Sequence, residues 1–317
     1  MHSNPGCRER RFVIAALAAL FVHPLSGTAQ GSATESAASG AFPSNSAVLE
    51  ILKERVARGR TAGLVVGLLD AGGHTRFVSW GQQGSPVIDN QSVFEIGSVT
   101  KVFTATLLAD MVLKGEVSLD DPVQDYLPPG VTVPTRSGKP ITLGLLAEQR
   151  SGLPRLPDNI KPADLSNPYA DYSVQQLYDF LSSYNLTRDP GAAFEYSNLG
   201  VGLLGHALAL RAGVPYEVLI RRRVLEPLGM THTGVTLSPW MEGHLIAGHD
   251  ERGDEVPLWD LPTLAGAGAL RSTAADLLLF LAANLETDRG PLGAAMDLAQ
   301  TERAQTSTPT WLSGSTG

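Results

Sequence analysis

The sequence predicts an α/β fold in which an antiparallel sheet is flanked by helices and accompanied by a mostly helical lobe. Three observations support this prediction. Apolar residues recur at helical spacing over residues 46–57, and the short apolar runs 61–69 and 76–80 flank the glycine-rich stretch Asp70-Ala71-Gly72-Gly73-His74. Two such runs around a glycine-rich turn are typical of a β-hairpin. From about residue 116 to 260, amphipathic helical segments alternate with residues that favour turns.

The N-terminus has the pattern of an export signal rather than of a folded element. A basic segment, an apolar run and a small-x-small cleavage site follow one another, at Arg8, Arg10, Arg11, residues 12–22 and Gly27-Thr28-Ala29. The apolar run is short for a membrane span, so we predict a cleaved signal peptide over residues 1–29 and a periplasmic or secreted protein. Residues 30–44, rich in Ser, Ala and Gly, are predicted to be a flexible leader. One domain is expected over residues 45–317.

Composition excludes several function classes. The chain of 317 residues has a formal net charge of −8 and no basic stripe, which argues against nucleic acid as a partner. Its only cysteine, Cys7, lies in the predicted signal, so a cysteine nucleophile, a cysteine-ligated zinc ion and disulfides are excluded. His244 and His249 lack a third ligand at useful spacing, so we interpret them as loop histidines and expect no metal or cofactor.

Further helices are predicted from apolar periodicity and from residues that favour helix ends. They cover residues 141–146, 174–184, 198–212, 218–228 and 273–285. Gly229 is expected to end the fourth of these helices, and Ser272 is expected to be the N-cap of the last one.

The stretch Ser98-Val99-Thr100-Lys101 is the first candidate for chemistry. Gly97 permits a tight turn, Ser98 stands where an N-cap or first-turn residue would stand, and apolar residues continue at helical spacing until Gly115. Ser98 and Lys101 therefore share one face of a helix. A lysine held neutral by burial or by a nearby cation can take the serine proton. The alternative is a capped helix with a solvated lysine.

The second candidate is Tyr196-Ser197-Asn198, in a turn-rich segment before a glycine-rich helix. On an extended loop, residues two apart point the same way, so Tyr196 and Asn198 can both face a cleft. A phenol can transfer a proton, and a carboxamide can orient a substrate carbonyl group. The alternative is a tyrosine packed on the surface beside an asparagine that caps the helix.

Together the two motifs resemble the serine β-lactamase and penicillin-binding-protein superfamily, in particular its class C β-lactamase group. That group also contains D-alanyl-D-alanine carboxypeptidases and family VIII carboxylesterases. The resemblance extends over about residues 45–285. The phrases that carry it are Phe94-Glu95-Ile96-Gly97-Ser98, Gly115-Glu116-Val117-Ser118-Leu119-Asp120-Asp121-Pro122-Val123, Ser151-Gly152-Leu153-Pro154, Tyr196-Ser197-Asn198-Leu199-Gly200 and Pro227-Leu228-Gly229-Met230.

The resemblance implies a β-lactamase-like (DD-peptidase) fold and a role for each candidate residue. Ser98 would be the nucleophile that forms an acyl-enzyme, and its N–H would be one donor to the oxyanion. Lys101 would activate Ser98, Tyr196 would shuttle a proton to the leaving group, and Asn198 would hold Lys101 or a substrate amide.

The resemblance also implies a reaction and a class of partner. We expect a monomeric periplasmic hydrolase that cleaves β-lactam amides through an acyl-serine intermediate, with a small molecule as its partner, no cofactor and no stable membrane span. The alternatives are a D-alanyl-D-alanine carboxypeptidase, a family VIII carboxylesterase, or a truncated homologue with impaired catalysis.

Two stretches depart from the pattern of the group. Its third motif, Lys or His followed by a small residue and Gly, is not found in its usual place. His232-Thr233-Gly234 matches by letter but directly follows Pro227-Leu228-Gly229-Met230, so we interpret it as a structural turn, and Ser315-Thr316-Gly317 lies at the chain end. We therefore expect a C-terminally truncated domain that lacks strands. Glu148-Gln149-Arg150 also differs from the group, and we interpret it as local packing.

Overall fold

The structure is a computed structural model that describes residues 43–59, 61–70, 72–82, 87–250, 252–285 and 290–301. The predicted signal peptide, most of the predicted leader and Ser315-Thr316-Gly317 lie outside the described residues. The chain forms two compact units. The first contains the residues up to 90 together with 249–255, and the second contains residues 91–248 and those from 256 onward.

The first unit is a helix packed on a β-hairpin, as predicted. Helix α1 (Asn45–Ala57) begins after Ser44, whose side chain accepts a hydrogen bond from the Ala47 N–H. Strands β1 (Gly63–Leu69) and β2 (Thr75–Gly81) are antiparallel, with Gly63 opposite Gly81 and Leu69 opposite Thr75. Apolar side chains of both elements form a small core made of Val48, Leu52 and Val78, with Leu49, Leu64, Val66 and Leu68 packed against it.

The turn of this hairpin is held by one carboxylate. The Oδ1 atom of Asp70 accepts hydrogen bonds from the N–H groups of Gly72 and His74, at 2.8 and 2.9 Å. An aspartate that bonds the backbone just after itself is a common turn former. A second short strand pair, β4 (Gly248–His249) and β5 (Glu255–Val256), closes around Asp250, whose N–H donates to the Asp254 carbonyl oxygen.

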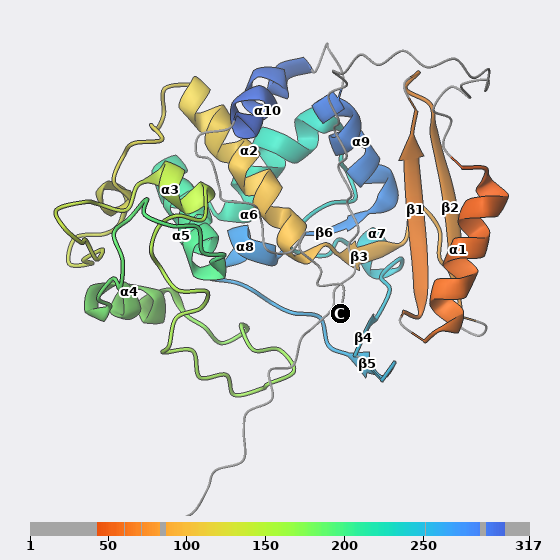
Figure 1. Cartoon of the computed structure of the whole chain (residues 1–317), viewed down its shortest axis with the longest axis horizontal. Coiled ribbons are helices and arrows are strands. Elements are labelled where there is room, and N and C mark those ends of the chain that lie inside the picture. The colour runs from red at the N-terminus through yellow and green to blue at the C-terminus, as the bar shows by residue number, and fades with distance from the viewer. Residues whose placement is uncertain are drawn as a thin grey trace, which may run out of the picture. The chain divides into compact units, whose positions relative to one another are not determined.

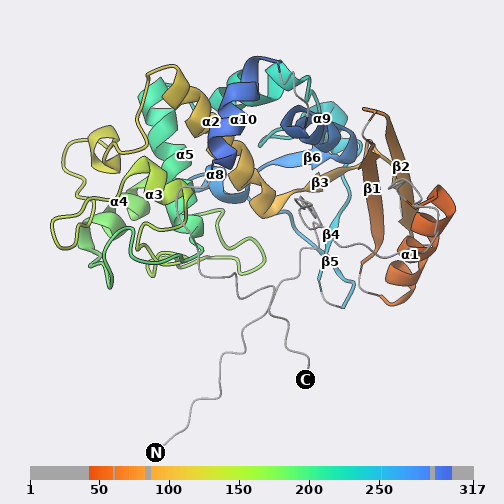
Figure 2. The same ribbon diagram turned by 45° about the horizontal axis from the view of Figure 1, so that its top comes forward.

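The second unit is built on the antiparallel pair β3 (Val93–Glu95) and β6 (Arg271–Thr273), which lie side by side in Figures 1 and 2. Backbone bridges extend the pair on both sides, from Val93 to Leu245 and from Arg271 to Gly234. The small sheet connects segments far apart in the sequence and places residue 96, which follows β3, at the entrance to the main helix of the unit.

That helix is α2 (Thr100–Leu113), preceded by a 3₁₀ turn at Gly97–Val99. Its apolar face is fully buried, with Phe103, Leu107 and Met111 at 0% exposure. Helix α2 contacts α5 (Asn198–Ala212), α8 (Ala265–Gly268) and α10 (Gly293–Gln300), and Figure 1 shows it in gold near α8 and α10. Gly115 follows with φ of 68°, as predicted for the residue that ends the helix.

Three further helices agree with the predicted segments, apart from shifted ends: α3 (Leu143–Ala147), α4 (Val174–Ser183) and α9 (Ala274–Leu285). Helix α6 (Tyr216–Ile220) covers only the start of the predicted helix 218–228, and α7 (Pro239–Glu242) was not predicted. Within residues 116–260 the regular elements are mainly helices, with β4 and β5 besides, and the limits of the predicted helical lobe remain a prediction.

Two predictions about helix boundaries were wrong. The segment 218–228 is not one helix: α6 passes into a π-helical turn at Arg221–Leu225 and a 3₁₀ turn at Glu226–Leu228, which Gly229 ends in the left-handed conformation. Ser272 is not the N-cap of α9, because the helix begins at Ala274 and the residue before it is Thr273. The Thr273 Oγ1 atom accepts from the Asp276 N–H at 3.1 Å, as an N-cap does.

Within the described ranges, no single helix is long and apolar enough to cross a membrane. The helices Asn198–Ala212 and Tyr216–Leu228 satisfy that test only as a pair, and they are bent by 79° relative to each other.

Candidate active site

Ser98 lies in the short 3₁₀ turn that joins β3 to α2. Gly97 begins this turn with φ of 48°, a conformation that costs glycine little. The Ser98 side chain does not cap the helix, so of the two predicted positions, N-cap or first turn, Ser98 takes the first turn. In this turn the Ser98 Oγ atom forms hydrogen bonds with other side chains. It accepts a hydrogen bond from the Tyr196 hydroxyl at 2.6 Å and lies 3.0 Å from Lys101 Nζ.

Lys101 lies one turn further along, and its amine has three oxygen neighbours. Lys101 Nζ lies 3.0 Å from Ser98 Oγ, 2.9 Å from Asn198 Oδ1 and 2.6 Å from the carbonyl oxygen of Ala267. The last two oxygens can only accept hydrogen bonds. A neutral amine has two N–H groups and one lone pair. As an ammonium, Lys101 donates to all three oxygens; as a neutral amine, its two N–H groups can serve Asn198 and Ala267, and its lone pair is available to the Ser98 hydroxyl.

The surroundings of Lys101 favour the neutral amine. Burial lowers the pKa of Lys101 to about 7, and the positive charge of Arg155 contributes to the same shift. The three oxygens around Nζ belong to a hydroxyl, a carboxamide and a backbone carbonyl, and none of them carries a charge that would stabilise the ammonium. The site therefore combines a serine hydroxyl with a base that is substantially neutral near pH 7.

Tyr196 and Asn198 are positioned by the start of α5. Ser197 is the N-cap of that helix, with its Oγ atom accepting from the Gly200 N–H at 2.8 Å. Asn198 is the first helical residue, so the alternative in which Asn198 caps the helix was wrong. Lys101 Nζ lies 4.8 Å from the centroid of the Tyr196 ring. The four predicted residues thus meet at one point, although 97 positions separate Lys101 from Asn198 in the chain.

Gln149 fixes the segment that carries Tyr196. Its Oε1 atom accepts from the Ser197 N–H at 2.6 Å, and its backbone oxygen accepts from the Glu195 N–H at 2.8 Å. Gln149 itself has φ of 59°, which is unusual for a residue with a side chain. Glu148-Gln149-Arg150 was interpreted as local packing. Gln149 does pack locally, and its two hydrogen bonds also orient the loop that carries Tyr196.

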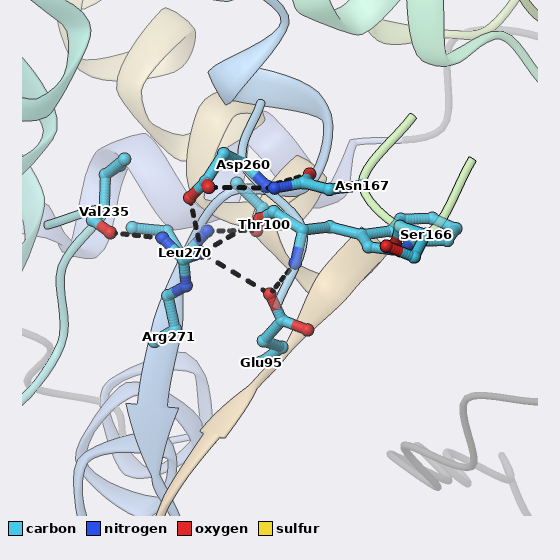
Figure 3. Close-up of polar contacts among 9 residues, drawn as sticks. Glu95, Thr100, Ser166, Asn167, Val235, Asp260, Leu270 and Arg271 are labelled. Carbon is cyan, nitrogen blue, oxygen red and sulfur yellow. Dashed lines mark hydrogen bonds and ion pairs between the residues drawn. The ribbon is translucent and has the colours of Figure 1, made fainter. Parts of the chain in front are cut away.

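A buried arginine supports the other side of the nucleophile turn (Figure 3). The Arg271 guanidinium contacts Glu95 Oε1 at 3.5 Å and Asp260 Oδ1 at 3.2 Å, and it donates to the carbonyl oxygen of Val235 at 2.6 Å. Asp260 in turn exchanges two hydrogen bonds with Asn167. Because Glu95 stands three residues before Ser98, this network anchors the strand end from which the turn begins.

His232-Thr233-Gly234 is held in a structural role. The buried Thr233 hydroxyl bonds Asp276 and Ser272, each at 2.7 Å, and the Gly234 backbone pairs with Arg271. The ring of His232 stacks on Trp240 with 3.6 Å between centroids. None of the three contacts Ser98 or Lys101, in agreement with the interpretation as a turn.

Of the two histidines considered as metal ligands, His244 follows α7 and His249 is the second residue of β4. The His244 ring stacks on Trp240, which also stacks with His232, and the centroids of His244 and Trp240 lie 3.8 Å apart. The Nδ1 atom of His244 lies 2.8 Å from the Trp240 carbonyl oxygen. Across the ranges that the structure describes, no group of three or more His, Cys, Asp or Glu side chains could hold a metal ion.

Comparisons with known proteins agree with this geometry. A family profile described as Beta-lactamase matches residues 48–317. The chain belongs to the beta-lactamase family. Among curated relatives, the D-alanyl-D-alanine-carboxypeptidase/endopeptidase AmpH of Escherichia coli K12 is 36% identical over 208 residues, which are 66% of this chain and 52% of AmpH. The chain thus aligns with about half the length of that relative.

Solved structures of beta-lactamase family proteins confirm the fold. A beta-lactamase/D-alanine carboxypeptidase from Yersinia pestis, complexed with citrate, superposes with a TM-score of 0.70 at 27% identity, covering 82% of this chain and 74% of its own. A class C beta lactamase from Rhodobacter sphaeroides gives 0.66 at 29% identity, covering 81% and 70%. The predicted β-lactamase-like fold, with many helices and small antiparallel sheets, is confirmed.

Two groups at the site were missed from the sequence. The carbonyl oxygen of Ala267 is a backbone atom 166 positions from Lys101, and no side-chain pattern indicates it. Arg155 lies with its Cζ atom 5.3 Å from the centroid of the Tyr196 ring. Arg155 directly follows Ser151-Gly152-Leu153-Pro154, one of the segments that carry the family resemblance. This position in the sequence could have indicated that Arg155 lies near the site.

Proposed function

We propose that this member of the beta-lactamase family is a serine hydrolase that forms an acyl-enzyme on Ser98, with β-lactam amides as its substrates. The observation that carries the proposal is the position of Lys101 Nζ, 3.0 Å from Ser98 Oγ, with acceptors at Asn198 and Ala267 for the two N–H groups of a neutral amine. The Tyr196 hydroxyl on the same oxygen supplies the second proton-transfer group that an acyl transfer needs.

Acylation follows from these contacts. The Ser98 oxygen bonds to the substrate carbonyl carbon while its proton moves to Lys101 Nζ. The C–N bond to the leaving nitrogen then breaks, and Tyr196 gives its proton to that nitrogen. The extra proton on the Lys101 ammonium then returns to the Tyr196 oxygen, so that both groups regain their starting protonation states. The Ser98 N–H, in the turn before α2, is the candidate donor to the oxyanion.

Hydrolysis of the acyl-enzyme uses the same groups in reverse. Water attacks the ester carbonyl carbon, its proton passes to the Tyr196–Lys101 pair, and the Ser98 oxygen leaves with a proton from that pair. The rate of this second step separates a β-lactamase, which releases its product, from a penicillin-binding enzyme, which stays acylated.

A peptidase is the second candidate. AmpH is named a D-alanyl-D-alanine-carboxypeptidase/endopeptidase, and 36% identity over 208 residues favours related chemistry on D-alanyl peptides. Export, predicted from residues 1–29, would place either activity outside the cytoplasm and is part of the proposal.

The test is the intact mass of the purified chain, followed over time after mixing with a penicillin. We expect an adduct of the mass of the drug in the wild type and none in Ser98→Ala. Decay of the adduct within the assay supports a β-lactamase, and a stable adduct supports the peptidase candidate. An adduct of equal yield in Ser98→Ala would contradict the assignment of the nucleophile.

A further inference from the structure

Arg155 presents an exposed guanidinium beside the candidate active site. Its Cζ atom lies 5.3 Å from the centroid of the Tyr196 ring, and the hydroxyl of that ring bonds Ser98 Oγ. A single phenol ring therefore separates this cation from the nucleophile. Guanidinium groups stack favourably on aromatic rings, so the contact also limits where the arginine can point.

The backbone of Arg155 is fixed to the same helix that positions Tyr196. Its carbonyl oxygen accepts hydrogen bonds from the N–H groups of Asn198 and Leu199, at 3.0 and 3.2 Å. Next to it, the Pro154 carbonyl oxygen accepts from the Ser197 hydroxyl at 2.6 Å. Arg155 is thus held at a constant place relative to the site, unlike an arginine on a mobile surface loop.

The Arg155 guanidinium has no ion-pair partner among the described residues. Other arginines of this unit form ion pairs, as Arg136 does with Asp189, Arg188 with Glu195, and Arg223 with Asp110 and Glu116. In the part of the chain that the structure describes, no carboxylate lies within ion-pair distance of Arg155. The guanidinium has five N–H donors in a planar fork that matches a carboxylate.

We propose that Arg155 binds an anionic group of the substrate, a carboxylate, and so makes the site selective for charged acyl substrates over neutral esters. This inference rests on the proposed function, because it concerns a substrate bound at Ser98. It also favours the two candidates whose substrates carry a free carboxylate, a β-lactam or a D-alanyl peptide, over a carboxylesterase. Arg155 is a specificity residue in this account and takes no part in the transfer of protons.

The test compares a chromogenic cephalosporin with its own methyl ester, which lacks only the negative charge. In Arg155→Gln we expect KM for the acid to rise about 10- to 100-fold, as for the loss of a charge-assisted hydrogen-bonded pair, with kcat changed less than threefold. KM for the methyl ester should stay within about twofold. Assays at pH 8.5 keep Lys101 neutral in both proteins, so that the loss of the Arg155 charge near Lys101 does not enter the comparison.

The matched control is Arg222→Gln, because Arg222 is an exposed arginine in the segment Arg221–Leu225 and its loss changes the net charge equally. It should leave both substrates within about twofold. A result in which Arg155→Gln weakens the acid and the methyl ester equally, or neither, would overturn the proposal.

A binding measurement separates this proposal from the proposed function. In Ser98→Ala, which cannot be acylated, calorimetry should show the acid binding more tightly than the methyl ester, and the further change Arg155→Gln should abolish that difference. Equal binding of the two compounds, or binding of neither, would contradict the role of Arg155. Hydrolysis that persists in Ser98→Ala would instead contradict the proposed function and leave the binding result to stand separately.

Discussion

The two ends of α2 each carry a lysine, and the two lysines have opposite surroundings. At the N-terminal end, Lys101 is largely enclosed and contacts only uncharged oxygens, from Ser98, Asn198 and Ala267. At the C-terminal end, the half-exposed Lys114 lies 2.8 Å from Asp110 Oδ1, and Arg223 lies 2.7 Å from the other carboxylate oxygen.

The difference shows that the partner atoms, rather than the helix, decide what a lysine can do. A carboxylate stabilises an ammonium, so an ion pair favours the charged form. Neutral acceptors in a buried place satisfy the N–H groups without compensating a charge, and the pKa of Lys101 accordingly falls to about 7. The same residue type forms an ion pair at one end of α2 and, in the proposed function, is the base at the other.

The largest effect is expected from Lys101→Arg. A guanidinium stays protonated at every accessible pH, so it cannot take the Ser98 proton. We expect the rate of acylation by a penicillin to fall about 10³-fold, a typical loss when a general base is removed. The measurement is the rate of adduct formation by intact mass.

Lys114→Arg is the control for this change at the other end of the helix. An arginine can keep the ion pair with Asp110, so acylation should stay within about twofold of the wild type. Equal losses in Lys101→Arg and Lys114→Arg would show that the substitution damages α2 and would remove the distinction between its ends.

Asn198→Asp should make the N-terminal end resemble the C-terminal end. A carboxylate 2.9 Å from Lys101 Nζ would stabilise the ammonium and raise its pKa by about one to two units. At pH 7 the fraction of neutral amine, and with it the acylation rate, should fall about 5- to 50-fold. The pH dependence of acylation would check this: its acidic limb should move to higher pH, and the rate at pH 9.5 should largely recover. A loss independent of pH would mean that Asn198 acts on the substrate instead.

Asp110→Asn should affect stability and leave chemistry nearly unchanged. The buried Asp110 joins Lys114 and Arg223, and its loss leaves Arg223 with Glu116 alone. We expect the free energy of unfolding to fall by about 2 kcal/mol in urea denaturation, with acylation at 20 °C within twofold.

Glu226→Gln serves as the matched control for that carboxylate. It breaks the exposed pair with Arg221 at 3.6 Å, and exposed pairs contribute at most about 1 kcal/mol. Equal destabilisation by Asp110→Asn and Glu226→Gln would show that burial of the network at the C-terminal end of α2 has no energetic importance.

Local patterns predicted the elements that carry the site. The spacing of Ser98 and Lys101 brought the two side chains together because the 3₁₀ turn at Gly97–Val99 continues directly into α2, and the hairpin of the first unit followed from two apolar runs around a glycine-rich turn. The resemblance to the family's motifs then predicted that Tyr196 and Asn198 belong to the same site. Helix ends were less predictable: both Ser272 and Thr273 can cap a helix and both pair with β3, and only the start of α9 at Ala274 makes Thr273 the cap.

The interactions missed from the sequence are those that depend on tertiary structure. The Ala267 carbonyl reaches Lys101 because α8 packs on α2, and any residue at position 267 would present the same oxygen. The break of the predicted helix at Arg221–Leu225 depends on packing as well, since Val224 and Leu225 are buried while the three preceding arginines face outward or form ion pairs.

The most direct test of the central claim is the pH dependence of the rate at which a penicillin acylates Ser98 in the wild-type protein. A base with a pKa of about 7 must lose its proton before it can act. The rate should therefore rise about tenfold per pH unit below pH 7 and level off above it. A rate that is flat from pH 5 to 9, or one that rises only near pH 10, would contradict a neutral Lys101 as the base.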